Sequence, residues 1–173
     1  MIKYFITDPN YSLDLIKKAI FIHRPDFVCY RNKKYYSKEE IIAFAKFANR
    51  YSKTIIHIDS LKENSLLEFF DGIHFSSSKI DLISRYKNLT TIASTHTIQE
   101  VKKAKQADFI TFSPIFKSKG REGLGTDVIE EVYKHHKKII ALGGIVSEKE
   151  VGEIEKTKAV GFASIRYFLH NFM

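Results

Sequence analysis

The feature that most constrains this chain is an alternation of short apolar runs with segments of helical periodicity. Each run spans four to six residues, is rich in Ile, Val, Phe and Thr, and is followed by a polar turn. Runs of this length and composition are typical of strands buried on both faces, as in a parallel sheet. The expected strands are Ile2–Thr7, Phe27–Arg31, Thr54–Ile58, Gly72–Phe75, Thr90–Ala93, Phe109–Phe112, Ile139–Leu142 and Val160–Ala163.

Four segments between these runs carry Ser or Thr followed three residues later by Glu. That spacing is typical of a capping box, in which the hydroxyl and the carboxylate satisfy unpaired N–H groups at a helix N-terminus. Each pair follows an expected strand, so the pattern predicts helices between parallel strands. The pairs are Ser37/Glu40, Ser60/Glu63, Thr97/Glu100 and Ser147/Glu150.

The eight strand–helix units predict an α/β fold, a (βα)8 TIM barrel with a parallel eight-stranded sheet. With 173 residues, about 22 are available per unit, which is enough for a strand, a short helix and two loops. We therefore expect a single domain over residues 1–173. The alternative is an open doubly wound sheet, which usually has a glycine-rich turn after its first strand. Residues 7–10 (Thr-Asp-Pro-Asn) contain no glycine.

Composition narrows the classes of function. A single cysteine, Cys29, excludes an internal disulfide and cysteine-based metal motifs, so we expect a cytoplasmic protein. No apolar stretch is long enough for a membrane span. The formal net charge of +8 is scattered, without an arginine-rich arm or zinc-finger spacing. It predicts a basic surface that attracts anionic small molecules rather than nucleic acid or membrane. The sequence leaves both a monomer and a homo-oligomer possible.

In a TIM barrel the active site forms at the carboxyl ends of the strands. Most expected strands end in side chains that donate hydrogen bonds or carry positive charge, which predicts an anionic ligand. Arg31 and Lys33 are spaced by two residues, so both point to one face if the strand continues. We therefore predict that the two side chains together bind an anion at the barrel mouth. The alternative is that one of them points into the barrel and the other lies in solvent beyond the strand end.

Two glycine-containing segments predict phosphate contacts. Gly143 and Gly144 follow the seventh expected strand, where bare backbone amides let a phosphate approach. Ser164 and Arg166, after the eighth strand, would complete that site, and the alternative is a tight turn that needs positive φ. The loop of residues 117–125 contains three glycines and three cations and predicts a lid over phosphate oxygens. The alternative for this loop is an exposed surface segment without order.

Metal ligands are sparse in the sequence. Asp8 and Asp59 are the only carboxylates at expected strand ends that suit Mg2+. Each has the alternative role of capping the next helix. His57, His74 and His96 lie near strand ends, but their spacing matches no metal motif and favours polar residues lining the barrel mouth.

Seven segments, in this order, resemble the thiamine phosphate synthase / TenI family over nearly the whole chain. They are Tyr4–Asp8, Arg31–Lys33, Ile55–Asp59, Asp71–His74, Ser94–Glu100, Ser113–Phe116 and Ala141–Ile145. The resemblance implies a (βα)8 barrel that joins a hydroxymethylpyrimidine pyrophosphate to a thiazole phosphate with the aid of Mg2+. Pyrophosphate leaves first, and the thiazole nitrogen then traps the pyrimidine cation. The implied partner is therefore a phosphorylated small molecule.

The resemblance also implies roles for individual residues. Those assigned to pyrophosphate, as catalytic residues, are Arg31, Lys33 and Ser94, with Ser118 and Arg121 in the lid motif. Those assigned to the thiazole phosphate are Gly143 and Gly144, and the position of Ser164 and Arg166 after the eighth strand adds these two as expected phosphate contacts. Asp59 is the residue assigned to Mg2+.

The chain departs from the family pattern at several positions. Cys29 stands where the family has Gln, Ile58 where it has Asn, and Arg166 where it has Ser. The second Mg2+ aspartate of the family falls within residues 76–79, where this chain has no carboxylate. A site with one metal carboxylate is expected to bind Mg2+ weakly, and Arg166 or Arg121 could supply positive charge instead.

The departures leave three functional hypotheses. The first is a thiamine phosphate synthase. The second is a thiazole tautomerase of the TenI branch, but Ser113 stands where that branch has its catalytic histidine, so His74 or His96 would have to replace it. The third is a catalytically degenerate homologue that binds a phosphorylated ligand, since one barrel supports many functions.

Overall fold

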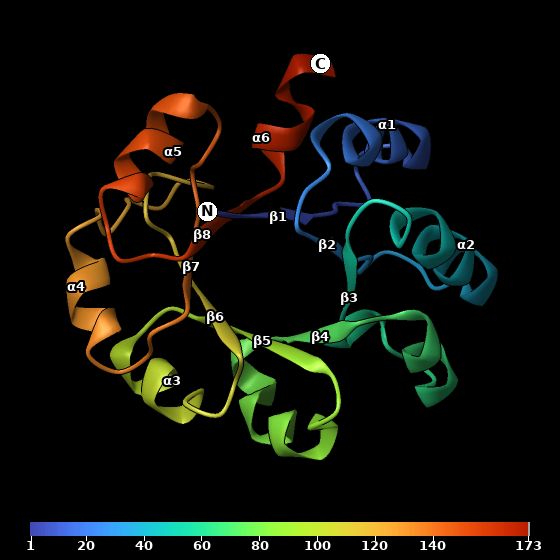
Figure 1. Ribbon diagram of the computed structural model, residues 1–173, viewed down its shortest axis with the longest axis horizontal. Coiled ribbons are helices and arrows are strands. Elements are labelled where there is room, and N and C mark those ends of the chain that lie inside the picture. The colour runs from blue at the N-terminus through green and yellow to red at the C-terminus, as the bar shows by residue number, and fades with distance from the viewer. Residues whose placement is uncertain (173) are drawn as a thin grey trace.

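Eight parallel strands close into one barrel in the computed structural model, which describes residues 1–172 of the chain (Figure 1). Strand order around the barrel follows the chain, and β1 pairs with β8 to close it. This confirms the predicted TIM barrel over the open sheet. The strands are β1 (Ile2–Ile6), β2 (Phe27–Tyr30), β3 (Lys53–His57), β4 (Gly72–Phe75), β5 (Thr90–Thr95), β6 (Phe109–Phe112), β7 (Ile139–Leu142) and β8 (Gly161–Ser164).

Helical segments lie outside the barrel and cover it (Figure 1). The α-helices are α1 (Leu13–His23), α2 (Lys38–Ala48), α3 (Ile98–Lys103), α4 (Val128–Tyr133), α5 (Glu148–Glu155) and α6 (Arg166–Leu169). The crossovers after β3 and β4 are 3-10 segments instead of α-helices, and a last 3-10 turn follows α6. These segments are η1 (Ile58–Ser60), η2 (Asn64–Phe69), η3 (Ser77–Tyr86) and η4 (His170–Phe172).

Three of the four predicted helix starts are confirmed. Ser37 and Thr97 cap α2 and α3 through their hydroxyls, and Ser147 forms a complete capping box with Glu150 at α5. The fourth prediction, at Ser60, is wrong. The Ser60 hydroxyl instead accepts the backbone N–H of Asn32 at 3.0 Å, so it ties the loop after β2 to the end of β3.

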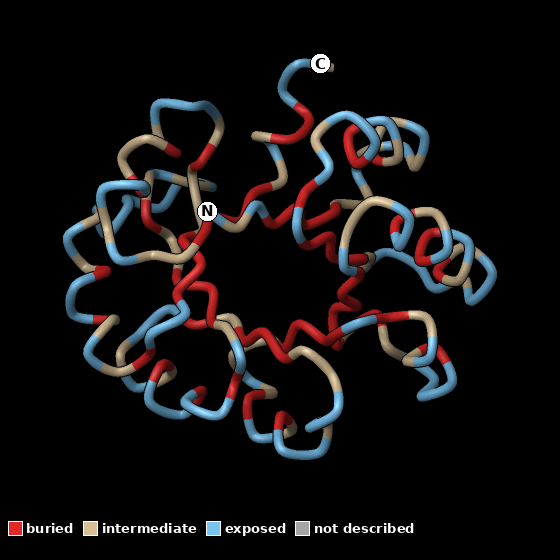
Figure 2. The backbone as a smooth tube through the Cα atoms, viewed as in Figure 1, coloured by how far each residue is buried: buried red, intermediate tan, exposed pale blue. Residues whose placement is uncertain are grey.

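Buried residues follow the strands and the inner faces of the helices, while the outer faces are exposed (Figure 2). Alternation along each strand separates two cores, because successive side chains point to opposite faces. Phe5 and Val28 pack outward against the helices. The core within the barrel consists of Tyr4, Ile6, Phe27, Cys29, Ile55, Ile92, Ile140 and Ala163.

The amino ends of three strand pairs carry the same hydrogen-bonded clamp. In each, an Asp just before the even-numbered strand accepts a backbone N–H at the start of the preceding odd-numbered strand. Asp26 accepts from Lys3 at 2.8 Å and Asp71 from Thr54 at 2.8 Å. Asp108 accepts from Thr91 at 2.9 Å. These clamps tie β1, β3 and β5 to their neighbours at the end of the barrel opposite the site.

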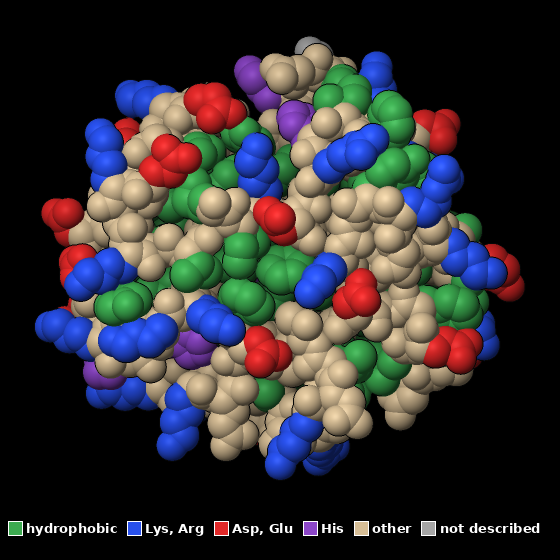
Figure 3. Space-filling view, viewed as in Figure 1, with side chains coloured by type: hydrophobic (Ala, Val, Ile, Leu, Met, Phe, Trp, Pro, Cys, Tyr) green, Lys and Arg blue, Asp and Glu red, His purple; other side chains and the backbone are tan. Residues whose placement is uncertain are grey.

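The surface charge is dispersed on the face seen in Figure 3, where Lys and Arg side chains alternate with Asp and Glu around the periphery. The described part of the chain, residues 1–172, contains no helix with the length and apolar character of a membrane span.

Candidate functional site

A cavity of about 680 Å³ opens at the carboxyl ends of the strands. The residues predicted to form the site line it, with Asp59 as the exception. The lining residues among them are Arg31, Lys33, Ser94, Ser118, Arg121, Gly143, Gly144, Ser164 and Arg166. The barrel therefore brings together residues from the loop after β2, from β5, from the loop after β6 and from the ends of β7 and β8. Their binding roles stay predictions.

Arg31 and Lys33 lie just beyond β2, which ends at Tyr30. Both line the cavity, so they reach the same space although the strand stops before them. The backbone N–H of Arg31 donates to the Thr7 hydroxyl at 3.1 Å, which joins this loop to the end of β1. Lys33 has an acidic neighbour, since its Nζ lies 3.5 Å from Asp59 Oδ2.

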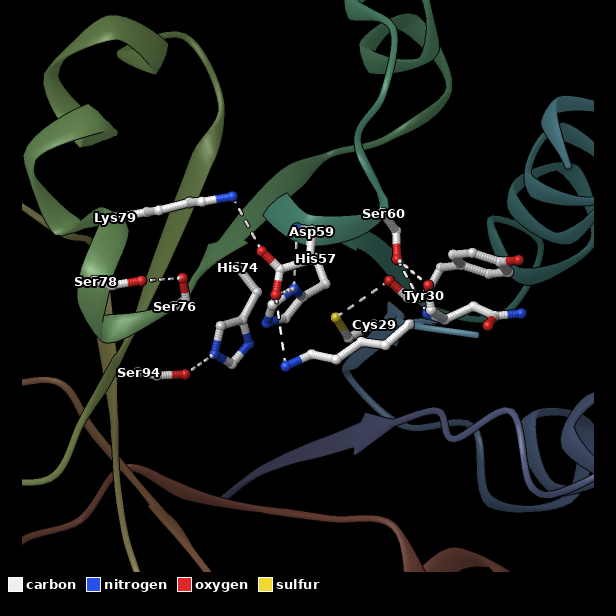
Figure 4. A network of polar contacts seen from close by, with 12 residues as sticks. Cys29, Tyr30, His57, Asp59, Ser60, His74, Ser76, Ser78, Lys79 and Ser94 are labelled. Carbon is white, nitrogen blue, oxygen red and sulfur yellow. Dashed lines mark hydrogen bonds and ion pairs between the residues drawn. The ribbon is translucent and has the colours of Figure 1, made fainter. Parts of the chain in front are cut away.

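Asp59 is paired with two lysines at the rim of the cavity. Its Oδ1 lies 3.1 Å from Lys79 Nζ, and its Oδ2 lies 3.5 Å from Lys33 Nζ. Lys79 reaches over from η3, after β4, as Figure 4 shows. Partial burial raises the pKa of Asp59, but the Lys79 hydrogen bond and the nearby positive charges outweigh it, so that pKa is lowered overall. Asp59 is therefore ionised at neutral pH.

His57 supports the backbone beneath this carboxylate. Its Nδ1 accepts the Asp59 N–H at 3.2 Å, which requires an unprotonated nitrogen. Burial, followed by the charges of Arg31, Lys33 and Lys79 against an opposing effect of Asp59, lowers the pKa of His57 to about 4. The ring is thus neutral at pH 7, and its 3.6 Å approach to Asp59 Oδ2 is not an ion pair there.

The residues present do not fit the Mg2+ site that the family resemblance implies. Mg2+ takes oxygen ligands in octahedral geometry and is usually held by one or two carboxylates. Here both oxygens of Asp59 face lysine ammonium groups, and residues 76–79 supply no second carboxylate. Within residues 1–172, no group of three His, Cys, Asp or Glu side chains is arranged to hold a metal.

A buried hydrogen-bonded chain crosses the barrel interior to the cavity. The Tyr4 hydroxyl lies 2.7 Å from His74 Nδ1, and His74 Nε2 lies 2.7 Å from Ser94 Oγ (Figure 4 shows the second contact). Burial, and then repulsion from His57 in its protonated form and from Arg31, lower the pKa of His74, so its ring is neutral at pH 7. If Tyr4 donates to Nδ1, His74 donates to Ser94, and the Ser94 hydroxyl proton is free to point into the cavity.

Packing requires glycine at both positions after β7, in addition to the predicted role in binding a ligand. Gly143 and Gly144 have φ values of 101° and 72°, which favour glycine. A Cβ on Gly143 would lie 2.7 Å from Pro114 Cα, and one on Gly144 would lie 2.6 Å from the Lys117 carbonyl oxygen. The tight-turn interpretation is therefore confirmed, and a phosphate role stays an additional prediction.

Ser164 and Arg166 lie where β8 passes into α6. The Ser164 hydroxyl donates to the Ile145 carbonyl at 2.7 Å and accepts the Tyr167 N–H at 3.1 Å. Its proton is thus already used, so Ser164 holds the turn together instead of offering a free donor. Arg166 lines the cavity, so the positive charge at this end comes from it.

The loop after β6 is ordered and folds over the cavity. Ser118 and Arg121 exchange backbone hydrogen bonds at 3.0 and 2.9 Å. The two residues between them, Lys119 and Gly120, have φ values of 51° and 74°, as a type I′ turn requires. The base of the loop is anchored, because the Gly125 N–H donates to the Ile115 carbonyl at 2.9 Å. These hydrogen bonds give the loop a defined turn, although most of its residues are exposed, and its role as a lid over phosphate oxygens stays a prediction.

Two of the departures from the family pattern are buried. Cys29 lies inside the barrel, and burial raises the pKa of its thiol to about 12, so it stays neutral. Ile58 is also buried, at the start of η1. Neither lines the cavity, so the polar contacts that the family residues would make at these positions are absent.

Sequence reasoning missed two features of the site. The first is Lys79, which falls within residues 76–79, where the family pattern has a metal carboxylate; a cation in that segment is itself the signal. The contact from Tyr4 to His74 joins residues 70 positions apart. Its signal was a tyrosine on an expected strand whose alternation points into the barrel, where a buried hydroxyl needs a partner.

The fold and site together define a TIM-barrel protein with a cation-rimmed cavity at the carboxyl ends of its strands. A family model described as "Thiamine monophosphate synthase" (TMP-TENI) matches residues 3–168. The chain belongs to this family, which confirms the resemblance noted in the sequence.

Individual relatives agree with the family assignment. A curated protein of Aquifex aeolicus (strain VF5), "Putative thiamine-phosphate synthase 2", is 32% identical over an alignment of 126 positions, which covers 68% of this chain and 67% of that protein. A thiamine phosphate pyrophosphorylase from Pyrococcus furiosus superposes with a TM-score of 0.77 at 17% identity, over 98% of this chain and 94% of that one. A second thiamine phosphate pyrophosphorylase, from Bacteroides thetaiotaomicron, superposes with a TM-score of 0.66 at 21% identity, over 96% of this chain and 84% of that one. At these identities the solved structures support the fold alone.

Proposed function

We propose that this protein is a thiamine phosphate synthase-type transferase. It would couple hydroxymethylpyrimidine pyrophosphate to thiazole phosphate and release pyrophosphate. The observation that carries the proposal is that a single cavity holds cations at the end of β2 and a glycine turn with Arg166 at the ends of β7 and β8. Two anionic groups can then bind at separate points of the rim, with the reacting atoms between them.

The pyrophosphate end is assigned to Arg31 and Lys33, with Arg121 from the loop after β6. In the reaction, the bond from the pyrimidine methylene carbon to the pyrophosphate oxygen breaks, and the electron pair leaves with pyrophosphate. Cations at that oxygen stabilise the charge that develops as the bond breaks. Ser118, in the same loop as Arg121, is assigned a hydrogen bond to these oxygens.

The thiazole phosphate end is assigned to the Gly143–Gly144 backbone and to Arg166, with Ser164 holding the turn. Binding the phosphate there would position the thiazole nitrogen, whose lone pair forms the new bond to the methylene carbon. Ser94, on β5, lines the same cavity. Its hydroxyl, oriented by His74, is assigned to the leaving pyrophosphate oxygen.

The test is a coupling assay with both substrates in which thiamine phosphate is detected by chromatography. The variant Arg31→Gln is expected to lower kcat/KM roughly 10- to 100-fold, because it removes charge-assisted hydrogen bonds worth about 1.5–3 kcal/mol. The matched control is Arg85→Gln, since Arg85 is exposed and has no hydrogen bond or ion pair within the described residues. It is expected to retain wild-type activity.

Absence of product from the wild-type protein, in buffers with and without Mg2+, would refute the proposal. Equal losses in Arg31→Gln and Arg85→Gln would refute the role of Arg31 and leave the reaction itself standing.

A second candidate, a thiazole tautomerase of the TenI type, is favoured by one observation. His96 lines the cavity, and its Nδ1 lies 3.2 Å from Glu100 Oε2, which is an arrangement suited to proton transfer. His74 is a poorer candidate, because both of its nitrogens are already engaged. If isomerisation of a thiazole phosphate is observed without coupling, and His96→Gln abolishes it, the tautomerase assignment replaces the first.

A further inference from the structure

The rim between β3 and β4 carries a second lysine where the family pattern calls for a metal carboxylate. Lys79 lies in η3 at a break in the helical backbone, with φ −120° and ψ 17°. Its Nζ donates to Asp59 Oδ1 at 3.1 Å. The side chain points toward the end of β3 and meets Asp59 there, as Figure 4 shows.

Asp59 is already neutralised within the chain. Its two oxygens face Lys79 and Lys33 separately, so a divalent cation that bound this carboxylate would have to displace an ammonium group. A cation at that point would also approach the remaining lysine and Arg31 at short range, and like charges repel most strongly at a partly buried site. The charged side chains around Asp59 thus disfavour binding of a metal ion and favour binding of an anion.

The cluster leaves excess positive charge beside the cavity. Lys33 and Lys79 contribute two charges against the one of Asp59, and Arg31 adds a third on the same side. His57 adds none, since it is neutral at pH 7. Asp59 therefore acts as a tether that holds two ammonium groups within 3.5 Å of itself at the rim.

We propose that Lys79 takes the place of the metal ion, so that this site binds a diphosphate group without Mg2+. This inference rests on the proposed function, because it concerns the pyrophosphate end of the same cavity. The ammonium groups of Lys79 and Lys33, positioned by Asp59, donate hydrogen bonds to the diphosphate oxygens that Mg2+ would otherwise coordinate.

The experiment is isothermal titration of inorganic pyrophosphate into the whole protein, once in EDTA and once in excess Mg2+. Wild-type protein is expected to bind in EDTA with a Kd within about threefold of the Kd in Mg2+. Lys79→Gln is expected to weaken binding in EDTA at least about tenfold, the effect of losing one charge-assisted contact. Lys87→Gln is the control, since Lys87 ends the same segment and is exposed.

A third variant tests the converse. Lys79→Asp places a second carboxylate on η3, on the side that faces Asp59, and is expected to make pyrophosphate binding dependent on Mg2+. Because the Lys79 side chain is 43% exposed and Lys87 is exposed, all three substitutions are expected to leave the fold intact, which circular dichroism would verify.

The outcomes separate this inference from the proposed function. Binding by the wild type that requires Mg2+ would overturn the role of Lys79 and leave the synthase proposal intact. Equal affinities for wild type and Lys79→Gln in EDTA would do the same. No binding of pyrophosphate under either condition would overturn both.

Discussion

At the scale of single residues, one imidazole ring connects the barrel interior to the cavity. His74 is buried, and its two nitrogens contact the hydroxyls of Tyr4 and Ser94, each at 2.7 Å. A neutral histidine in this position needs both partners, because a buried polar atom without a hydrogen bond costs stability. The orientation of Ser94 thus depends on a tyrosine on the far side of the barrel.

Replacing Tyr4 with Phe is expected to lower the free energy of unfolding by about 1–3 kcal/mol. The substitution keeps the ring and its packing but leaves His74 Nδ1 buried without a partner. Urea denaturation followed by circular dichroism measures the change. Tyr36→Phe is the control, since Tyr36 is exposed and its hydroxyl makes no hydrogen bond within residues 1–172; its effect should stay within about 0.5 kcal/mol. Equal stability of the two variants would contradict a structural role for the Tyr4 hydroxyl.

Most of the site could be predicted from the sequence, because strand ends in a TIM barrel converge on one place. Arg31, Ser94 and Gly143 were found in this way. Side-chain partners could not be predicted, since they depend on distances between strands. The hydroxyl of Ser164 is used inside its own turn, and Asp59 is paired with Lys79 from the next unit along the barrel.

At the scale of elements, the three aspartate clamps are the recurring device. The clamp of Asp108 is reciprocal, because the Asp108 N–H also donates to the Thr91 hydroxyl at 3.0 Å. Each clamp satisfies an N–H at the start of a strand, where the sheet ladder begins. This stabilises the pairing of adjacent units independently of the site at the other end.

The variant Asp108→Ala is expected to reduce the free energy of unfolding by about 1–2 kcal/mol, because the Thr91 N–H and hydroxyl lose their acceptor. Asp81→Ala serves as control, since Asp81 is exposed and makes no hydrogen bond or ion pair in the described part of the chain. The ligand affinity of both variants should match wild type. A loss of affinity in Asp108→Ala, without a loss of stability, would contradict the assignment.

The positions of the strands could be predicted better than whether the segments between them are α-helices or 3-10 helices. Short buried runs located every strand within two residues, because apolar composition and turn residues bound them on both sides. The capping spacing failed at Ser60, where the hydroxyl found a partner in the neighbouring loop. Sequence periodicity alone could not distinguish an α-helix from the 3-10 segments that follow β3 and β4.

At the scale of the whole molecule, buried neutral histidines make stability depend on pH. The pKa of His57 is about 4 in the folded protein, against an ordinary value of about 6.5. Between these values the unfolded chain binds more protons, so the free energy of unfolding falls as pH falls. The pKa of His74 is lowered as well and acts in the same direction.

Lowering the pH from 7.5 to 5 is expected to cost roughly 2 kcal/mol of stability through His57 alone, at about 1.36 kcal/mol per pH unit. Urea midpoints measured across this range give the slope. The variant His57→Gln should show a correspondingly flatter dependence, because Gln can accept the Asp59 N–H without titrating. Parallel curves for wild type and variant would show that His57 does not carry the effect.

Closure of the barrel has a consequence for how the chain reaches its fold. Every strand pairs with its sequence neighbours, and within residues 1–172 the β1–β8 seam is the only strand pairing that joins distant parts of the chain. The other pairings enclose short loops, whereas the seam must bring Ile2 to Gly161, with the largest loss of chain entropy. Joining the seam should therefore be the slow, late event. Gly161 leaves room for it, because a single methyl group there would lie 2.4 Å from the Ile2 carbonyl oxygen.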